Sequence, residues 1–576
     1  MSCRQVIIYT NASTDFEITS PKQGWTYYDD TQIMLAVNVN TRDIVWTSDI
    51  SGYLGDGNHI TVFLPEGLHC INAEIQDVKK EMSVYVSSST VNVYSRSVLV
   101  NYIPLEIKIK EGNYTSFLYT HEGSVNDFWV SGIQTPSVEN RLRHSHSGIS
   151  EPLNRDIRLP MPQAGRYKEF KKDRYIFDRM YSSEQKRTFF VANTLYQYAS
   201  SHHIEAALFY QSNRLTVWIT DSNEVPENIL NECIQTVEML LIPRVEALWG
   251  KPADIDGDGR IAILFSRTLN AENMAIGFFN PADFFEINND VESEAYNPTS
   301  NQMDIIYAAV PDSDHGSVYS VKNVIATIAH ELTHACTFTA KTWNKMNNGD
   351  GNAKREELFL DEGWSHLTEN LCGVGVSGGN IKFLNRFLEN TSLYSLCGAN
   401  RYGQEDSAGM RGAITLFLSW LFWKSGGITW DASNPVTIID RGGISFLKKM
   451  TELSDTGWES IGTAYGRPVH ILFNEMLNEI NYYRRIERKY NYIIDPVTME
   501  AVEYFVNMGN IIIAGSADTI NVGFPHSATV NSLNALPSWS FIFYDNLFIP
   551  SDSLLTLYAG KNNGSVFYAY SSIPVP

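Results

Sequence analysis

Short runs of alternating apolar and polar residues dominate the first 95 residues of the chain. Glycine- and aspartate-rich turns separate these runs, as expected of strands joined by tight turns. The pattern predicts an all-β module with strands at residues 32–39, 44–47, 60–64, 70–75 and 82–86. Similar runs return near the other end of the chain, so we also expect a small C-terminal β module with strands at residues 511–514, 541–544, 555–558 and 565–570.

Between these two regions, apolar residues recur at helical spacing. In residues 321–338 the repeating apolar positions predict a largely buried helix; they are Val324, Ile325, Ile328, Leu332, Ala335 and Phe338. A second amphipathic helix is predicted in residues 356–371 from Leu358, Phe359, Trp364, Leu367 and Leu371. Further helices are expected at 226–249 and onward to about residue 480, after a β segment at 206–220.

The length of the chain predicts several domains, because 576 residues exceed the size of one compact domain. Changes of pattern divide the chain into residues 1–95, 96–187, 188–490 and 491–576. The second of these segments begins with strands and continues, from 138 to 187, as a basic stretch poor in periodic apolar residues. We interpret that stretch as a linker, with a propeptide-like segment as the alternative.

Charge and hydropathy exclude two classes of partner. The formal net charge of −21 argues against nucleic acid and against anionic membrane surfaces. The longest apolar run, at 413–423, is too short to span a bilayer and suits a buried helix. We therefore expect no transmembrane segment.

The first residues, Met1-Ser2-Cys3, leave two interpretations open. No apolar stretch precedes the cysteine. Ser2-Cys3 fits the remnant of a lipoprotein cleavage site, which would make Cys3 the point of a lipid anchor. An ordinary cysteine near a start codon is the equal alternative.

The most informative motif is H-E-L-T-H at residues 330–334. On a helix, His330 and His334 lie on one face, roughly 5–6 Å apart, and both can reach one Zn²⁺ at about 2.0–2.1 Å. Glu331 then lies beside the metal, where it can accept a proton from a zinc-activated water. A helix with two surface histidines is the alternative, but the apolar flanks argue against it.

A zinc site of this kind needs a third protein ligand and an open fourth position. In the second helix, Glu362 would point toward the first. Its neighbour Asp361 should face about 100° away around the helix, whereas His366 lies on the same face four residues later. Because a ligand histidine commonly gives its other N–H to a carboxylate, Glu369 is the expected acceptor one turn further on.

Residues 330–334, followed by F-L-D-E-G-W-S-H-L-T-E at 359–369, resemble the gluzincin zinc metallopeptidases, in particular the hyicolysin family. The resemblance covers about residues 188–480. It implies an α+β, thermolysin-like fold for residues 188–490, with His330, His334 and Glu362 as zinc ligands and Glu331 as general base. It also implies that an edge strand before the zinc helix, near residues 277–281 and 303–307, holds extended substrate.

A second resemblance concerns the N-terminal module. The segments I-V-W-T-S-D at 44–49, G-Y-L-G-D-G at 52–57 and L-P-E-G-L-H-C-I at 64–71 resemble bacterial surface Ig-like domains. An inward tryptophan and regular turn spacing fit such a sandwich. We therefore expect Trp46 in the core of an Ig-like module.

The donor for the developing oxyanion stays open. The hyicolysin resemblance implies a Tyr or His on a later helix, and residues 407–418 resemble that helix. Arg411 stands at the tyrosine position, where it can stabilise the oxyanion as a cation or form a salt bridge. Tyr402 and His366 are the alternative donors.

The segment D-I-D-G-D-G at 254–259 is a candidate calcium loop. Asp254, Asp256 and Asp258 supply carboxylates at alternating positions, as in calcium loops. Position 12 of the loop is Phe265, so the segment is not an EF-hand. A plain turn into a strand is the equal alternative.

Together these features predict an extracellular or cell-surface zinc metalloendopeptidase that acts on protein or peptide substrates. A zinc aminopeptidase would share the metal site, although the chain carries no G-x-M-E-N segment to anchor a free amine. A surface adhesion protein that retains the peptidase scaffold is the alternative without enzyme activity. The cofactors expected are Zn²⁺ and, at the aspartate loop, Ca²⁺.

Overall fold

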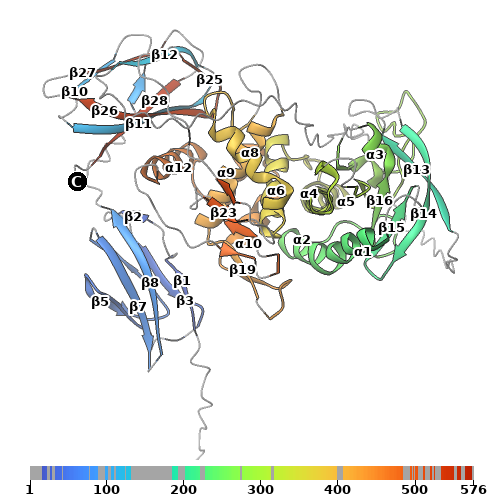
Figure 1. The fold of residues 1–576 in the computed structure, drawn as a ribbon, viewed down its shortest axis with the longest axis horizontal. Helices are drawn as coiled ribbons and strands as arrows, with labels where there is room; N and C mark the ends of the chain where they lie inside the picture. The colour runs from blue at the N-terminus through green and yellow to red at the C-terminus, as the bar shows by residue number, and fades with distance from the viewer. Residues whose placement is uncertain are drawn as a thin grey trace, which may run out of the picture. The chain divides into compact units, whose positions relative to one another are not determined.

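The structure is a computed structural model of the whole chain. Its described residues are 16–21, 26–28, 33–39, 41, 43–65, 67–76, 78–87, 98–100, 105–108, 112–122, 125–131, 185–192, 201–220, 227–272, 275–312, 317–397, 406–431, 433–483, 493–495, 497–498, 500–503, 510–512, 519–521, 525, 534–549, 554–559 and 565–573. The chain divides into two compact units (Figure 1), the first formed mainly by residues 1–97 and the second mainly by residues 116–568.

The first unit is all-β in its described part. One sheet has the strand order β1-β3-β6 and the other the order β2-β8-β7-β4-β5. The strands are β1 (Ile18–Ser20), β2 (Thr26–Tyr28), β3 (Ile33–Val37), β4 (Val45–Ser48), β5 (Gly52–Asp56), β6 (His59–Val62), β7 (Gly67–Ile75) and β8 (Val78–Ser87). Trp46 is fully buried and donates its indole N–H to the carbonyl of Gly57 at 2.8 Å. The predicted core position of Trp46 is thus confirmed.

The second unit contains a mixed sheet with the strand order β13-β14-β15-β16-β18-β17. Its strands are β13 (Lys186–Ala192), β14 (Ser201–Gln211), β15 (Leu215–Ile219), β16 (Ile261–Ser266), β17 (Gly277–Phe279) and β18 (Ile305–Ala309). The pairs β15–β16 and β16–β18 are parallel, whereas β17 runs antiparallel to β18. Among the described residues, β17 is therefore the terminal strand of the sheet on that side, and β18, which contains most of the predicted 303–307 strand, is interior.

Helices pack beside this sheet. The chain of helices that follows or interrupts it comprises α1 (Glu227–Thr236), η2 (Val237–Leu241), α2 (Ile242–Trp249), α3 (Arg267–Glu272), η3 (Pro281–Phe284), η5 (Ser317–Tyr319), α4 (Val321–Phe338), η6 (Thr339–Trp343), α5 (Asn344–Asn347), α6 (Leu358–Leu371), α7 (Gly375–Gly378), α8 (Asn380–Leu388), α9 (Ala408–Lys424), α10 (Gly443–Glu452), α11 (Gly457–Tyr465) and α12 (Val469–Tyr483). Helix α4 contacts β17 and β18 on one side and α6 on another, and α6 contacts α9. This stacking places α4 between the sheet and the later helices (Figure 1).

Helices α4 and α9 are buried along most of their length, as their apolar patterns predict. From Val324 to Phe338 every residue of α4 is buried, and Gly409 to Trp423 of α9 are buried as well. The apolar run at 413–423 is therefore a core helix. Within the described residues, no helix is both long and apolar enough to cross a membrane.

A second β region, most of which belongs to this unit, joins segments from opposite ends of the sequence. Strands β9 (Val98–Val100), β10 (Leu105–Lys108), β11 (Gly112–Glu122) and β12 (Val125–Ser131) share two sheets with β25 (Asn534–Leu536), β26 (Ser540–Ile549), β27 (Leu554–Ala559) and β28 (Ser565–Ile573). The sheet orders are β10-β27-β12-β25 and β26-β11-β28-β9. The hydrophobic pattern predicts strands at the start of residues 96–187 and at 541–544, 555–558 and 565–570, but it does not predict β12 or β25. It also assigns the two groups to separate segments and does not predict that they pair.

Short ladders complete the described strands. They are β19 (Ile428–Trp430) with β20 (Ile438–Asp440), β21 (Ile493–Ile494) with β22 (Ala501–Glu503), and β23 (Asn510–Ile512) with β24 (Thr519–Asn521). The chain thus combines sheet-rich regions with one helical region, and the domain boundaries drawn from the sequence stay predictions.

Candidate metal centre

Helix α4 carries the two histidines of the H-E-L-T-H motif on one buried face. The helix begins after Ser320, whose hydroxyl accepts from the backbone N–H of Asn323. The imidazole rings of His330 and His334 lie with their centroids 4.9 Å apart. Both residues are more than nine-tenths buried, so they need partners from a neighbouring element.

Helix α6 supplies such a partner in Glu362. Its Oε2 atom lies 3.2 Å from Nε2 of His330, and its Oε1 atom lies 3.9 Å from Nε2 of His334. Two imidazole nitrogens and one carboxylate therefore converge, and the spacing of these three residues can hold a metal ion. Asp361 and His366, the two rivals for the third position, are not part of this group.

The other ring nitrogen of each histidine faces a carboxylate. Nδ1 of His330 is 2.6 Å from Oε1 of Glu369, and Nδ1 of His334 is 3.1 Å from Oδ1 of Asp361. Because an ionised carboxylate only accepts hydrogen bonds, we assign the proton of each neutral ring to Nδ1. Both Nε2 lone pairs are then available toward Glu362, which is the donor set that zinc binds.

The contact of Glu369 confirms the expected acceptor, whereas the sequence gives no role to Asp361. Asp361 lies one position before Glu362, so the turn of the helix directs it to the flank where His334 lies. The sequence feature that could have indicated this role is a carboxylate directly before the glutamate expected to bind the metal.

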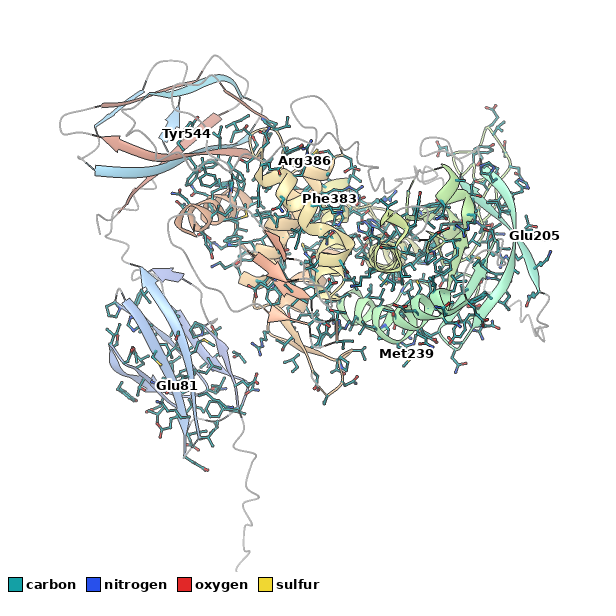
Figure 2. The ribbon with its side chains drawn as sticks, in the orientation of Figure 1. Glu81, Glu205, Met239, Phe383, Arg386 and Tyr544 are labelled. Atoms are coloured by element: carbon teal, nitrogen blue, oxygen red, sulfur yellow. The ribbon has the colours of Figure 1, made fainter. Side chains whose placement is uncertain are left out.

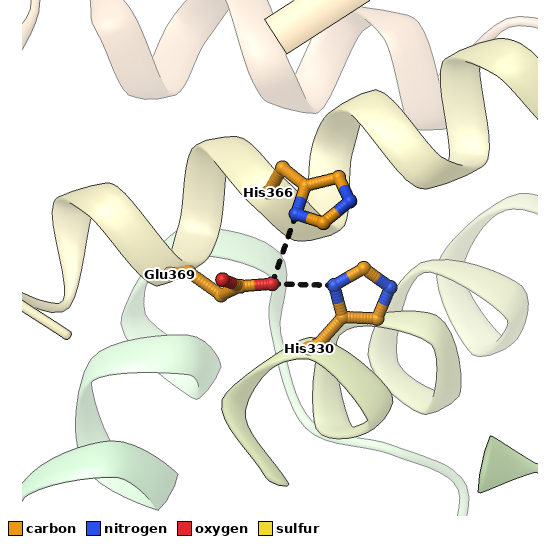
Figure 3. Close-up of side chains that lie close together, drawn as sticks. All are labelled: His330, His366 and Glu369. Atoms are coloured by element: carbon orange, nitrogen blue, oxygen red, sulfur yellow. Dashed lines mark hydrogen bonds and ion pairs between the residues drawn. The ribbon is translucent and has the colours of Figure 1, made fainter. Parts of the chain in front are cut away.

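His366 belongs to the surroundings of the His330–Glu369 contact (Figure 3). Its Nδ1 lies 3.1 Å from Oε1 of Glu369 and 2.9 Å from Oδ1 of Asn380. Asn380 donates its amide group to the His366 carbonyl and to Asn370, so its oxygen accepts from His366. Phe383, labelled on α8 in Figure 2, packs its ring against that of His366 at 5.2 Å.

These contacts keep Glu369 ionised. Burial alone raises the pKa of its carboxyl, but the electrostatic attraction of and hydrogen bonds from His366 and His330 outweigh burial and hold that pKa below its usual value. One anionic oxygen therefore serves two histidines. His366, one of the expected oxyanion donors, points its Nδ1 into this network.

Glu331 lies next to the first histidine on α4 and is buried. The start of β17 runs close beside it, because a Cβ atom added to Gly277 would lie 3.5 Å from Cγ of Glu331. The side chain of Glu331 thus lies beside the start of the terminal strand of the sheet.

Of the other expected donors, Arg411 is near the centre and Tyr402 lies outside the described residues. The guanidinium NH1 of Arg411 is 3.1 Å from Oε2 of Glu362. Its Nε and NH2 contact both oxygens of Asp406, at 3.0 and 2.8 Å. Of the two roles open from the sequence, the salt bridge is the one that the structure contains.

The aspartate loop is arranged differently from the prediction. Asp254 and Asp256 lie close enough to Asp304 to share a cation. Asp258 instead turns toward Arg260, whose backbone N–H it accepts at 2.8 Å. Burial, and then the neighbouring aspartates, raise the pKa of Asp256 to about 7, while burial is the main cause that raises the pKa of Asp304 to about 9.

Two histidines one helical turn apart on a buried helix, with a glutamate from a packed neighbouring helix, form the donor set of a metalloprotease. No family model matches the chain. The neutral metalloprotease ShpI of Staphylococcus hyicus is 24% identical to it over 208 residues, which cover 34% of this chain and 43% of ShpI. The match thus spans less than half of that relative, and this distant similarity supports a metalloprotease.

Proposed function

We propose that the chain is a zinc-dependent endopeptidase that hydrolyses internal peptide bonds of proteins. The observation that carries the proposal is the convergence of His330 Nε2, His334 Nε2 and the Glu362 carboxylate, with Nδ1 of each histidine engaged by its own carboxylate. A neutral imidazole with a fixed Nδ1 proton is the form that ligates zinc. Structural zinc sites rich in cysteine thiolates use a different set of ligands.

Zinc bound by these residues would supply a Lewis acid that polarises a peptide carbonyl and lowers the pKa of water to about 7. Glu331, beside His330 on α4, accepts the proton of the attacking water and delivers it to the leaving amine. Asp361 and Glu369 orient the histidines. The burial of the whole group excludes bulk water and strengthens these interactions.

The substrate would lie extended along β17. This strand pairs with β18 on one side, and within the described residues no strand pairs with its other side. An extended peptide can add itself to such an edge through main-chain hydrogen bonds. Because β17 starts beside Glu331, a peptide on this edge would pass the general base.

Gly277 permits this close approach of β17 to α4. An added Cβ would lie 2.7 Å from Cγ2 of Thr327 and 2.8 Å from the carbonyl oxygen of Tyr307. We expect Gly277→Ala to shift the strand, to cost about 1–3 kcal/mol of stability, and to lower kcat/KM by about 10–100-fold. Thermal unfolding and steady-state kinetics measure the two effects.

Gly351→Ala is the matched control for this substitution. Gly351 has no atom within 4 Å of an added Cβ and no positive φ, so the control should leave both quantities unchanged. Unaltered cleavage by Gly277→Ala would show that the substrate does not depend on the position of β17.

Other expectations stay predictions. They are the extracellular or cell-surface location, the Ig-like assignment of residues 1–95, and calcium at the aspartate cluster. The lipid anchor at Cys3 is a further one, and Cys3 lies outside the described residues.

Digestion of an unstructured protein such as casein tests the proposed function. We expect cleavage at internal bonds, complete loss of cleavage with a zinc chelator, and recovery on adding zinc. Stepwise release of single amino-terminal residues would instead indicate an aminopeptidase. Absence of any zinc-dependent cleavage by folded protein would contradict the proposal.

A further inference from the structure

Arg411 is a buried cation that joins two carboxylates at the candidate metal centre. Its side chain is only 3% exposed. Two of its nitrogens donate to Asp406, Nε to Oδ1 at 3.0 Å and NH2 to Oδ2 at 2.8 Å. The third, NH1, lies 3.1 Å from Oε2 of Glu362. This two-plus-one geometry uses the planar fork of a guanidinium, which a single ammonium group cannot reproduce.

The close packing of α6 against α9 places Arg411 next to Glu362. Gly363, directly after Glu362, has no room for a side chain, because an added Cβ would lie 2.7 Å from Cγ1 of Ile414 and 2.6 Å from Cδ1 of Leu418. Ile414 follows Arg411 by three residues and therefore lies on the same side of α9. The close approach at Gly363 thus brings the first turn of α9 to the carboxylate of Glu362.

We propose that Arg411, anchored by Asp406, is a positioning residue that holds the Glu362 carboxylate in its orientation for zinc. The inference rests on the proposed function and assigns Arg411 a different role from the oxyanion donor considered from the sequence. Arg411 contacts the third ligand directly, and it also compensates the negative charge of a glutamate buried among apolar helices. Asp406 fixes the guanidinium so that NH1 stays at Glu362.

The direct test measures the zinc dissociation constant of the full chain by competition with a chromogenic chelator. We expect Arg411→Lys to raise this constant about 10–100-fold, the usual effect of losing a partner of a metal ligand. Asp406→Asn, which removes the anchor but keeps Arg411, should raise it by a smaller factor. It also serves as the second variant if Arg411→Lys does not fold.

Arg467→Lys is the matched control. Arg467 makes a comparable bidentate contact with Glu475, at 2.9 and 2.5 Å, on an exposed part of the helical region. Its zinc dissociation constant should equal that of the wild type. The absorption spectrum of the Co²⁺-loaded chain supplies an independent readout, because a displaced Glu362 changes the ligand field in Arg411→Lys but not in Arg467→Lys.

Two results would overturn the inference, and a third would overturn the proposed function. An unchanged zinc dissociation constant with a lowered kcat at saturating zinc would make Arg411 a group that acts on the substrate. Wild-type zinc affinity in Arg411→Lys, with weakened binding in Arg411→Met, would reduce its role to charge alone. A wild-type chain that binds no zinc would contradict the proposed function itself. That failure is distinct from a failure of the inference, in which the wild type binds zinc and Arg411→Lys binds it equally well.

Discussion

Glu331→Gln is expected to lower kcat/KM for peptide hydrolysis by about 100- to 10,000-fold, the range that a general base contributes. Zinc binding should persist at one ion per chain, because Glu331 is outside the group formed by His330, His334 and Glu362. The amide of glutamine nearly matches the shape of the carboxylate but cannot accept a proton. The change therefore removes proton transfer and leaves the packing of α4 in place.

The measurement combines steady-state kinetics with metal analysis on the same preparation. Glu205→Gln is the control, since Glu205 lies on β14 with its side chain 61% exposed and paired with Lys186 (Figure 2). It should cleave at the wild-type rate. Full cleavage by a pure Glu331→Gln preparation would mean that another group accepts the proton.

Glu362→Ala is expected to remove zinc and, with it, proteolysis. The carboxylate is the contribution of α6 to the candidate centre, and two histidines alone leave a site short of the three protein ligands of a catalytic zinc. We expect less than stoichiometric zinc after dialysis and no detectable cleavage. Metal analysis and a casein digest measure both outcomes.

The same substitution should destabilise the zinc-free chain by about 1–3 kcal/mol. Arg411 loses the partner that NH1 contacts at 3.1 Å but keeps Asp406, so the loss is smaller than for a buried cation left alone. Denaturant unfolding in the presence of chelator measures it. Stoichiometric zinc in Glu362→Ala would show that another residue is the third ligand.

The local elements of this fold follow from the sequence because periodicity reports burial. The repeat of apolar residues from Val324 to Phe338 specifies a helix buried on nearly all sides, and α4 spans Val321–Phe338. The H-E-L-T-H spacing then fixes two histidines on one face of that helix. The role of Glu369 could also be predicted from the sequence, since a ligand histidine requires an acceptor for its second N–H.

The pairing of distant segments does not follow from periodicity. Alternation predicts a strand and its buried face, but not which strand it joins. The partnership of β10 and β12 with β27, which joins residues 105–131 to 554–559, therefore has no local signal. The place of Asp304 beside the aspartate loop was not predicted, for the same reason. Asp304 precedes β18 and lies near the loop only because β16 and β18 pair in parallel.

The role of Arg411 shows the same limit at the candidate centre. Its place in the sequence leaves open whether it faces the substrate or forms a salt bridge. The close packing of α9 on α6 at Gly363 turns it toward Glu362. Only the helix-to-helix distance decides between these roles, and no local pattern encodes that distance.

Zinc titration of the chelator-stripped chain, with cleavage of an internally quenched peptide followed at each addition, tests the central claim most directly. We expect cleavage to be absent at the start and to rise until one zinc ion is bound per chain, with His334→Ala giving no rise. Cleavage that persists after complete removal of zinc, or a chain that binds zinc without any cleavage, would contradict a zinc-dependent endopeptidase.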